Sequence, residues 1–171
     1  LTGALNVGFT VKPHILSLVL AACALVGPAN SHAADKSALA GKAVAAADAF
    51  LGTLSDSQKA AAVFAFDNET QRKNWSNLPT PMYKRAGLRL GNLDARQRAA
   101  ALAVLQAVLS PEGYTKVHQI MEGDEVLNQK GAPGNVIFGR DEYYLSFVGA
   151  PSATKPWTIQ FGGHHLAINA T

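Results

Sequence analysis

The chain of 171 residues is 48% hydrophobic and 16% charged, which is the composition of a globular domain and excludes a disordered tail. Its formal net charge of +3 comes from lysines and arginines that are scattered among acidic residues. This distribution is typical of a solvated surface, so we expect no nucleic-acid partner.

The first 33 residues have the pattern of a secretory signal peptide. Lys12 precedes the apolar run ILSLVLAACALVG, and the small residues SHA at 31–33 provide a cleavage site. The run is too short to span a membrane, so we predict a periplasmic or secreted protein with no membrane span after cleavage. The stretch LAAC also resembles a lipobox, and a lipid anchor on Cys23 is the alternative. Cys23 is the only cysteine, so the mature chain has no disulfide.

Helical patterns fill the chain before residue 67. Residues 35–54 are rich in alanine and contain no proline, which favours a first helix. Ser55 with Gln58 three positions later is a capping-box pattern, and it predicts a second, short helix.

A long connection rich in proline, asparagine and glycine follows at residues 67–92. Loops of this length are commonly functional or held by aromatic anchors. Arg72 and Trp75, spaced i and i+3, could bind an anionic or carbohydrate ligand by charge and stacking. In the alternative the pair only anchors the loop, with the arginine over the ring or paired to an acid.

Two more helices are expected after this connection. Asp94 and Gln97 form an N-cap pair before a wide apolar helical face. Ser110 as N-cap and Pro111 at the first helical position begin the next helix. His118 falls on the apolar face of that helix, so we expect it to face the core.

The sequence changes character after Gly131. The segments GNVIFG, EYYLSFVG and WTIQFGGHHLAIN are rich in β-branched and aromatic residues and are separated by glycine and proline. Helices followed by strands predict a single α+β domain over residues 34–171, with N-terminal helices packed on a C-terminal antiparallel sheet. The chain stops inside the last strand pattern, so we expect the domain to be incomplete at its C-terminus.

The segment FGGHHLAIN does not fit one regular strand. Its apolar residues occupy odd positions up to Phe161 and even positions from Leu166 onward, although one face of a strand keeps one parity. A β-bulge at the glycines would return both apolar sets to one face and turn His164 and His165 to the same side. A strand buried on both faces would also explain the change.

Two adjacent imidazoles in a mature chain without cysteine suit a divalent transition metal such as zinc, copper or iron. Asp141 or Glu142, just ahead of the strand pattern YYLSF, is the nearest third ligand in sequence, and His118 is another candidate. In the alternatives no metal is bound. The histidines then order the bulge by hydrogen bonding, or one of them contacts a substrate as an acid–base catalyst.

Tyr143 and Tyr144 lie on opposite faces of the expected strand, so at most one of them faces a cavity shared with the histidines. We take Tyr144, Arg72 and Trp75 as the candidate substrate-binding set. The sequence contains no GxSxG, P-loop or GxGxxG motif, so a serine hydrolase, an NTPase and a dinucleotide-binding protein lack sequence support.

Four segments, in the order RKNWSNLP, RAGLRLGNLDARQRAAALAVLQAVLSPEGYTKV, EYYLSFVGAP and WTIQFGGHHLAIN, resemble an exported bacterial family known as domain of unknown function number 3500. The resemblance runs from about Phe64 to the end, and the Trp to Gly-His-His-Leu segment is its most specific part. Members of that family look longer, which supports the expected truncation. The resemblance implies no activity and no site residues.

Two classes of function stay open. One is an exported metal-dependent enzyme, hydrolytic or oxidative, centred on His164 and His165. The other is a non-catalytic periplasmic binding or structural module in which the same histidines order a bulge. Either class can use a small-molecule ligand.

Overall fold

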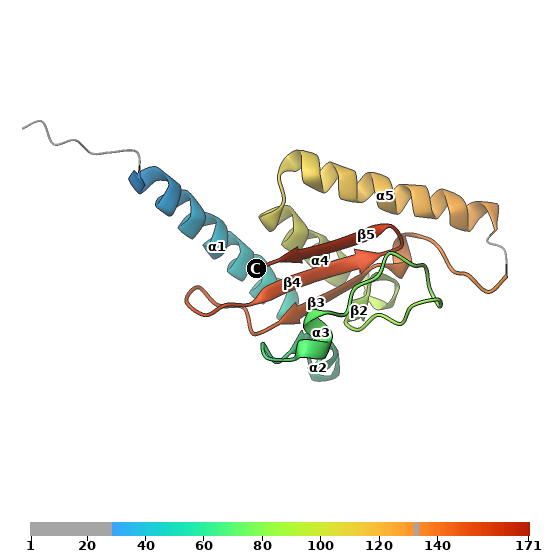
Figure 1. Cartoon of the computed structure of the whole chain (residues 1–171), viewed down its shortest axis with the longest axis horizontal. Coiled ribbons are helices and arrows are strands. Elements are labelled where there is room, and N and C mark those ends of the chain that lie inside the picture. The colour runs from blue at the N-terminus through green and yellow to red at the C-terminus, as the bar shows by residue number, and fades with distance from the viewer. Residues whose placement is uncertain (1–28, 132–133) are drawn as a thin grey trace, which may run out of the picture.

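The computed structural model describes residues 29–131 and 134–171 (Figure 1). It is an α+β domain with helices in its N-terminal part and a sheet in its C-terminal part, which confirms the predicted class. The apolar run of the signal pattern and Cys23 lie outside the described residues. No helix in the described ranges is both long enough and apolar enough to cross a membrane.

The helices are α1 (Ala29–Leu51), α2 (Asp56–Ala62), α3 (Glu69–Arg72), α4 (Ala95–Val108) and α5 (Pro111–Lys130), with the 3-10 turns η1 (Leu90–Asn92) and η2 (Arg140–Glu142). Three of the helices begin at the capping residues that the sequence predicts, whereas α1 begins before the expected residue 35 and α3 lies in the expected irregular connection. Ser55 with Gln58 and Asp94 with Gln97 form complete capping boxes, and Ser110 caps α5. These side chains satisfy backbone N–H groups that have no partner inside the helix.

The sheet is mixed. Its strands are β1 (Val63–Phe64), β2 (Leu88–Arg89), β3 (Tyr144–Val148), β4 (Thr158–Gly163) and β5 (Leu166–Ala170). The order is β1-β3-β4-β5, and β2 pairs with β3. The expected antiparallel pairing holds from β3 to β5, whereas β1 runs parallel to β3. The long connection through α4 and α5 permits this parallel pairing.

The two faces of the sheet differ in chemistry. One face packs on α1 and α4, while α3 and the segment after it lie over the other face (Figure 1). The face toward the helices carries the buried residues Leu145, Phe147, Ile159 and Phe161. The opposite face, which we call the outer face, carries Ser146 and Gln160. Buried polar groups need hydrogen-bond partners, so the covering segment must supply them.

The Gly-Gly-His-His segment forms a β-hairpin, so the predicted bulge within one strand is wrong. β4 ends at Gly163, β5 begins at Leu166, and these residues pair across a turn made by His164 and His165. A two-residue turn pairs positions of opposite parity, which explains the parity change in the sequence. His165 has the left-handed φ of 56°, an uncommon conformation for a residue other than glycine.

The segment 134–139 is not a strand, although its composition predicts one. It makes one isolated bridge, between Ile137 and Thr80. Gly134 and Gly139 have positive φ values of 68° and 118°, so the backbone turns at both ends of the segment.

Candidate functional site

The hairpin turn places His164 against α5. Its Nδ1 lies 2.7 Å from Oδ1 of Asp124, a residue that is only 3% exposed. The Tyr143 hydroxyl lies 3.1 Å from the other oxygen of this carboxylate and 2.9 Å from the carbonyl oxygen of His164. We call Asp124, Tyr143 and His164 the histidine-turn cluster. An ionised carboxylate only accepts hydrogen bonds, so it holds the imidazole with a proton on Nδ1.

Tyr143 is the second hydrogen-bond donor to Asp124 in this cluster, beside Nδ1 of His164. Burial, reinforced by the nearby negative charge of Asp124, raises the pKa of the Tyr143 hydroxyl well above its usual range. The hydroxyl therefore keeps its proton. Its ring is fully buried and stacks on Phe161 at 5.8 Å between ring centroids.

His165 lies on the exposed side of the turn, and its ring centroid is 3.9 Å from that of His164. The two imidazoles are thus neighbours, although a hairpin and not a bulge brings them together. Phe138 packs on His164 at 4.9 Å between ring centroids. The Nε2 atom of His164 makes no hydrogen bond to a described residue.

Asp141 and Glu142, the expected third metal ligands, pair with arginines. Oδ1 of Asp141 lies 2.5 Å from Nη2 of Arg98, and Glu142 accepts a 2.8 Å hydrogen bond from Nε of Arg89. Within residues 29–131 and 134–171, no group of three or more His, Cys, Asp or Glu side chains is arranged to hold a metal ion. Asp141 and Glu142 are therefore engaged by arginines and are not grouped with His164 and His165.

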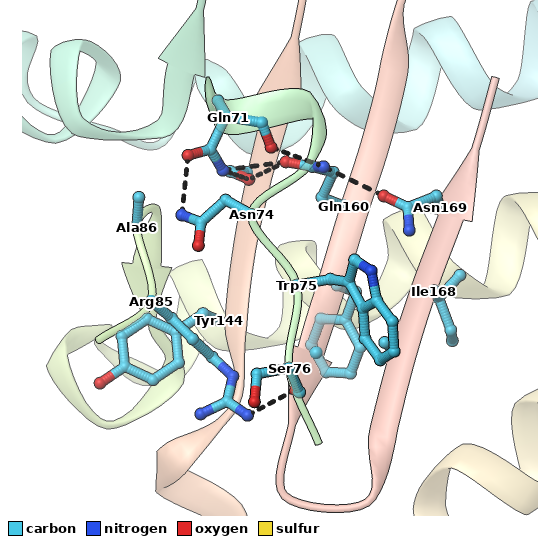
Figure 2. Close-up of a pocket in the computed structure, with 14 residues that line it drawn as sticks. Gln71, Asn74, Trp75, Ser76, Arg85, Ala86, Tyr144, Gln160, Ile168 and Asn169 are labelled. Carbon is cyan, nitrogen blue, oxygen red and sulfur yellow. Dashed lines mark hydrogen bonds between the residues drawn. The ribbon is translucent and has the colours of Figure 1, made fainter. Parts of the chain in front are cut away.

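A second polar site lies on the outer face of the sheet, beneath the segment that follows α3 (Figure 2). It is a pocket of about 40 Å³, which we call the outer-face pocket. Amides occupy one end of the pocket and Arg85 the other (Figure 2). The lining side chains with hydrogen-bonding groups include Gln71, Asn74, Arg85, Tyr144, Gln160 and Asn169.

Buried amides fix α3, which lies over the outer face, to the sheet. Nε2 of Gln71 donates to Oε1 of Gln160 at 2.9 Å and to Oγ of Ser146 at 3.3 Å. Nε2 of Gln160 donates to the main-chain carbonyl of Gln71 and to Oδ1 of Asn169, both at 3.1 Å. Mutually satisfied amides hold one arrangement, since breaking any bond leaves a buried polar group unpaired.

Arg85 is fixed by backbone carbonyls. Its Nη2 donates to the carbonyls of Ser76 (2.7 Å), Leu78 (2.6 Å) and Gly163 (2.8 Å). Its Nη1 is buried and has no acceptor among the described residues. Burial lowers the pKa of the guanidinium, whose usual value is so high that it stays charged. The charge of Arg85 is therefore held beside the pocket without a described carboxylate partner.

Trp75 and Tyr144, two of the three predicted substrate-binding residues, line the outer-face pocket. Trp75 is 61% exposed, and its indole stands beside Ile168 over the last two strands (Figure 2). It therefore does not anchor the loop in the core. Tyr144 reaches the pocket because its neighbour Tyr143 points to the opposite face, as alternation along a strand predicts.

Arg72 and His118 lie elsewhere. Arg72 sits over the Phe66 ring at 4.7 Å and donates to the Phe66 carbonyl, and it does not line the outer-face pocket. His118 is half-buried and packs edge-on against Tyr114, with 4.6 Å between ring centroids. His118 is thus only half-buried, whereas the sequence predicts that it faces the core.

Asp124 and Arg85 are the residues that the sequence analysis missed. Asp124 follows Val117 and Met121 on one helical face, at i, i+4 and i+7. A carboxylate on an apolar face was a usable signal, because a buried charge requires a partner. Arg85 lies in an irregular segment, where the spacing of residues does not show which side chains are buried.

Replacing Gln71 by alanine should lower the free energy of unfolding by about 2 kcal/mol, since Ser146 and Gln160 lose a buried partner. Urea denaturation measures this change. Gln119→Ala, at an exposed position of α5, is the control and should change stability by less than about 0.5 kcal/mol. Equal effects of the two substitutions would contradict the structural role of the amide network.

Fold and site together define an α+β domain with a polar pocket on the outer face of its sheet and a histidine turn at its hairpin. The chain belongs to a family described as protein of unknown function (DUF3500), whose family model matches residues 36–171. This match agrees with the resemblance seen in the sequence. No curated protein and no solved structure matches the chain.

Proposed function

We propose that this chain is an exported small-molecule binding module whose ligand lies over the outer-face pocket. The observation that carries the proposal is an exposed aromatic ring, Trp75, beside polar groups that are already held in place. Small-molecule sites typically combine aromatic surface with a few oriented polar groups. Groups ordered before binding lose little conformational entropy when the ligand arrives. Export is supported by the signal pattern of the first 33 residues.

In this proposal the histidine turn supports the pocket. The backbone N–H of His165 donates to the carbonyl of Asn77 at 3.0 Å, and Arg85 donates to the carbonyl of Gly163. Both bonds tie the turn to the segment that covers the outer face. The buried pair of Asp124 and His164 in turn holds the hairpin on α5.

A metal-dependent enzyme centred on His164 and His165 has less support. Asp141 and Glu142 are engaged by arginines, and Asp124, the carboxylate that contacts His164, already has two partners. We therefore do not include a metal in the proposed function.

A thermal-shift screen of small hydroxylated compounds tests the proposal. A ligand at a hundred times its Kd adds about 2.7 kcal/mol to stability, which should raise Tm by roughly 5–10 °C for a domain of this size. The shift should disappear in Trp75→Ala and persist in Val126→Ala, an exposed position of α5. The absence of any shift, or a shift that survives Trp75→Ala, would contradict the proposal.

A second candidate function is acid–base catalysis by His164. It is favoured by the buried Asp124 partner on Nδ1 together with an Nε2 that has no described hydrogen-bond partner. Diethyl pyrocarbonate should then carbethoxylate His164, as mapped by mass spectrometry. Asp124→Asn should slow the modification of His164 and leave the rate of modification of His165 unchanged. Modification of His165 with an inert His164 would exclude this candidate.

A further inference from the structure

The outer-face pocket has one charged lining residue among those that the structure describes, and that residue is Arg85. None of the described carboxylates lies within salt-bridge distance of its guanidinium. Arg72, Arg89, Arg98 and Arg140 each pair with an acid, and Arg96 is exposed on α4. The charge of Arg85 is therefore the one that a ligand is best placed to neutralise.

The geometry of Arg85 suits an anion. Its Nη2 is already bonded to three carbonyl oxygens, which set the plane of the guanidinium. Its Nη1 lacks an acceptor, and Nε makes no hydrogen bond to a described residue. Hydrogen bonds between a guanidinium and an anionic oxygen are stronger than those between neutral groups. An anionic group at this end of the pocket would supply the counter-charge that the described residues do not provide.

The pocket has room for a small charged group. Its volume of about 40 Å³ is more than one water molecule needs, so a group such as a carboxylate can enter. The rest of a ligand can extend to the open mouth, where Trp75 offers its exposed indole.

The mouth has the chemistry of a surface for a hydroxylated ring. The Trp75 indole supplies a flat apolar surface beside Ile168 (Figure 2). Asn169 is exposed, and because its Oδ1 accepts from Gln160, its amide N–H groups are available as donors. The Tyr144 hydroxyl makes no hydrogen bond to a described residue. Apolar stacking with polar groups at the edge matches a sugar ring.

We propose that the ligand is a hydroxylated ring carboxylate of the uronic-acid class, with the carboxylate in the outer-face pocket beside Arg85 and the ring against Trp75. This inference rests on the proposed function, because it assigns the ligand class of the same pocket. Two independent observations carry it: an arginine without a described acidic partner at one end of the pocket, and an exposed indole at its mouth.

Calorimetric titration with matched ligands tests the inference. Methyl glycosides of glucuronic and galacturonic acid are each compared with the neutral methyl glycoside, which differs only in having CH2OH in place of the carboxylate. We expect at least one acid to bind roughly tenfold more tightly than its neutral partner. Arg85→Gln should remove this preference, and Trp75→Ala should weaken the acid and the neutral sugar alike. Arg72→Gln, which changes an arginine outside the pocket, should alter neither.

The outcomes separate the two proposals. Equal binding of the acid and the neutral sugar, with both lost in Trp75→Ala, would overturn the ligand class and leave the binding function intact. If neither sugar binds but another compound raises Tm in a way that depends on Trp75, the ligand class is likewise overturned and the binding function stays intact. No compound of any kind giving such a shift would overturn both. If Arg85→Gln does not fold, Arg85→Lys is used instead, because it keeps the charge and should retain a weaker preference for the acid. Loss of this preference in folded Arg85→Lys would overturn the proposed ligand class. An unchanged preference in Arg85→Gln would also overturn it.

Discussion

Replacing Asp124 by alanine should lower the free energy of unfolding by about 3 kcal/mol, an effect near the upper end for single substitutions. Asp124 is 3% exposed and accepts hydrogen bonds from two separate elements, the Tyr143 hydroxyl and Nδ1 of His164. Alanine removes both acceptors and leaves the two donors with poorer partners. Chemical denaturation followed by circular dichroism measures the loss.

Asp141→Ala is the matched control for Asp124→Ala. Asp141 is also bonded to a basic side chain, Arg98, but it is largely exposed, so its removal should cost less than about 1 kcal/mol. His164→Ala in the Asp124→Ala background should cost less than it does alone, because the partners share one interaction. Additive effects of the two substitutions, or a loss below about 1 kcal/mol for Asp124→Ala, would show that the cluster does not hold the hairpin on α5.

Replacing Gly163 by alanine should destabilise the protein by about 2–3 kcal/mol through overpacking. A Cβ at this position would lie 2.6 Å from Cδ1 of Tyr143 and 2.7 Å from Cε1. The ring cannot move aside easily, since it is fully buried and stacked on Phe161. Calorimetric unfolding should show the decrease in Tm.

Gly123→Ala is the control for Gly163→Ala. It lies in α5 beside Asp124, and an added Cβ there meets nothing within 4 Å. Alanine is favoured over glycine inside a helix, so this substitution should stabilise the protein by about 0.5–1 kcal/mol. If Gly163→Ala left the stability of the protein unchanged or raised it, the close contact between β4 and the Tyr143 ring would be contradicted.

Local signals in the sequence predict most of the fold. Ser55, Asp94 and Ser110 mark the starts of helices because capping depends on residues within one turn of the chain. The change from helical to strand composition near Gly131 predicts the α+β class. The parallel pairing of β1 with β3 could not be predicted, because it joins Val63 to Phe147 across most of the domain.

The hairpin was missed because its turn lacks the usual residues. Two-residue turns favour Asn-Gly or Asp-Gly, whereas this one is His164-His165, with His165 taking the left-handed conformation at φ 56°. The parity change was the correct observation. A bulge and a two-residue turn both reverse parity, and only the pairing of Gly163 with Leu166 distinguishes them.

The candidate sites were partly predictable. His164, Trp75 and Tyr144 stand out by residue type and position, and each lies in one of the two polar sites. Their partners Asp124 and Arg85 are distant in sequence and come together only through the packing of α5 and of the segment after α3. Side chains brought together by tertiary contacts leave no regular spacing in a single sequence.

The most direct test of the outer-face site uses the two tryptophans of the chain. The indole N–H of Trp157 donates to the carbonyl of Ser152, away from the pocket, whereas Trp75 lines its mouth. In a nitrogen-15 NMR titration with the compound that raises Tm most, the Trp75 indole resonance should shift until saturation and the Trp157 resonance should stay in place. A shift confined to Trp157, or to the His164 and His165 turn, would contradict a ligand on the outer face of the sheet.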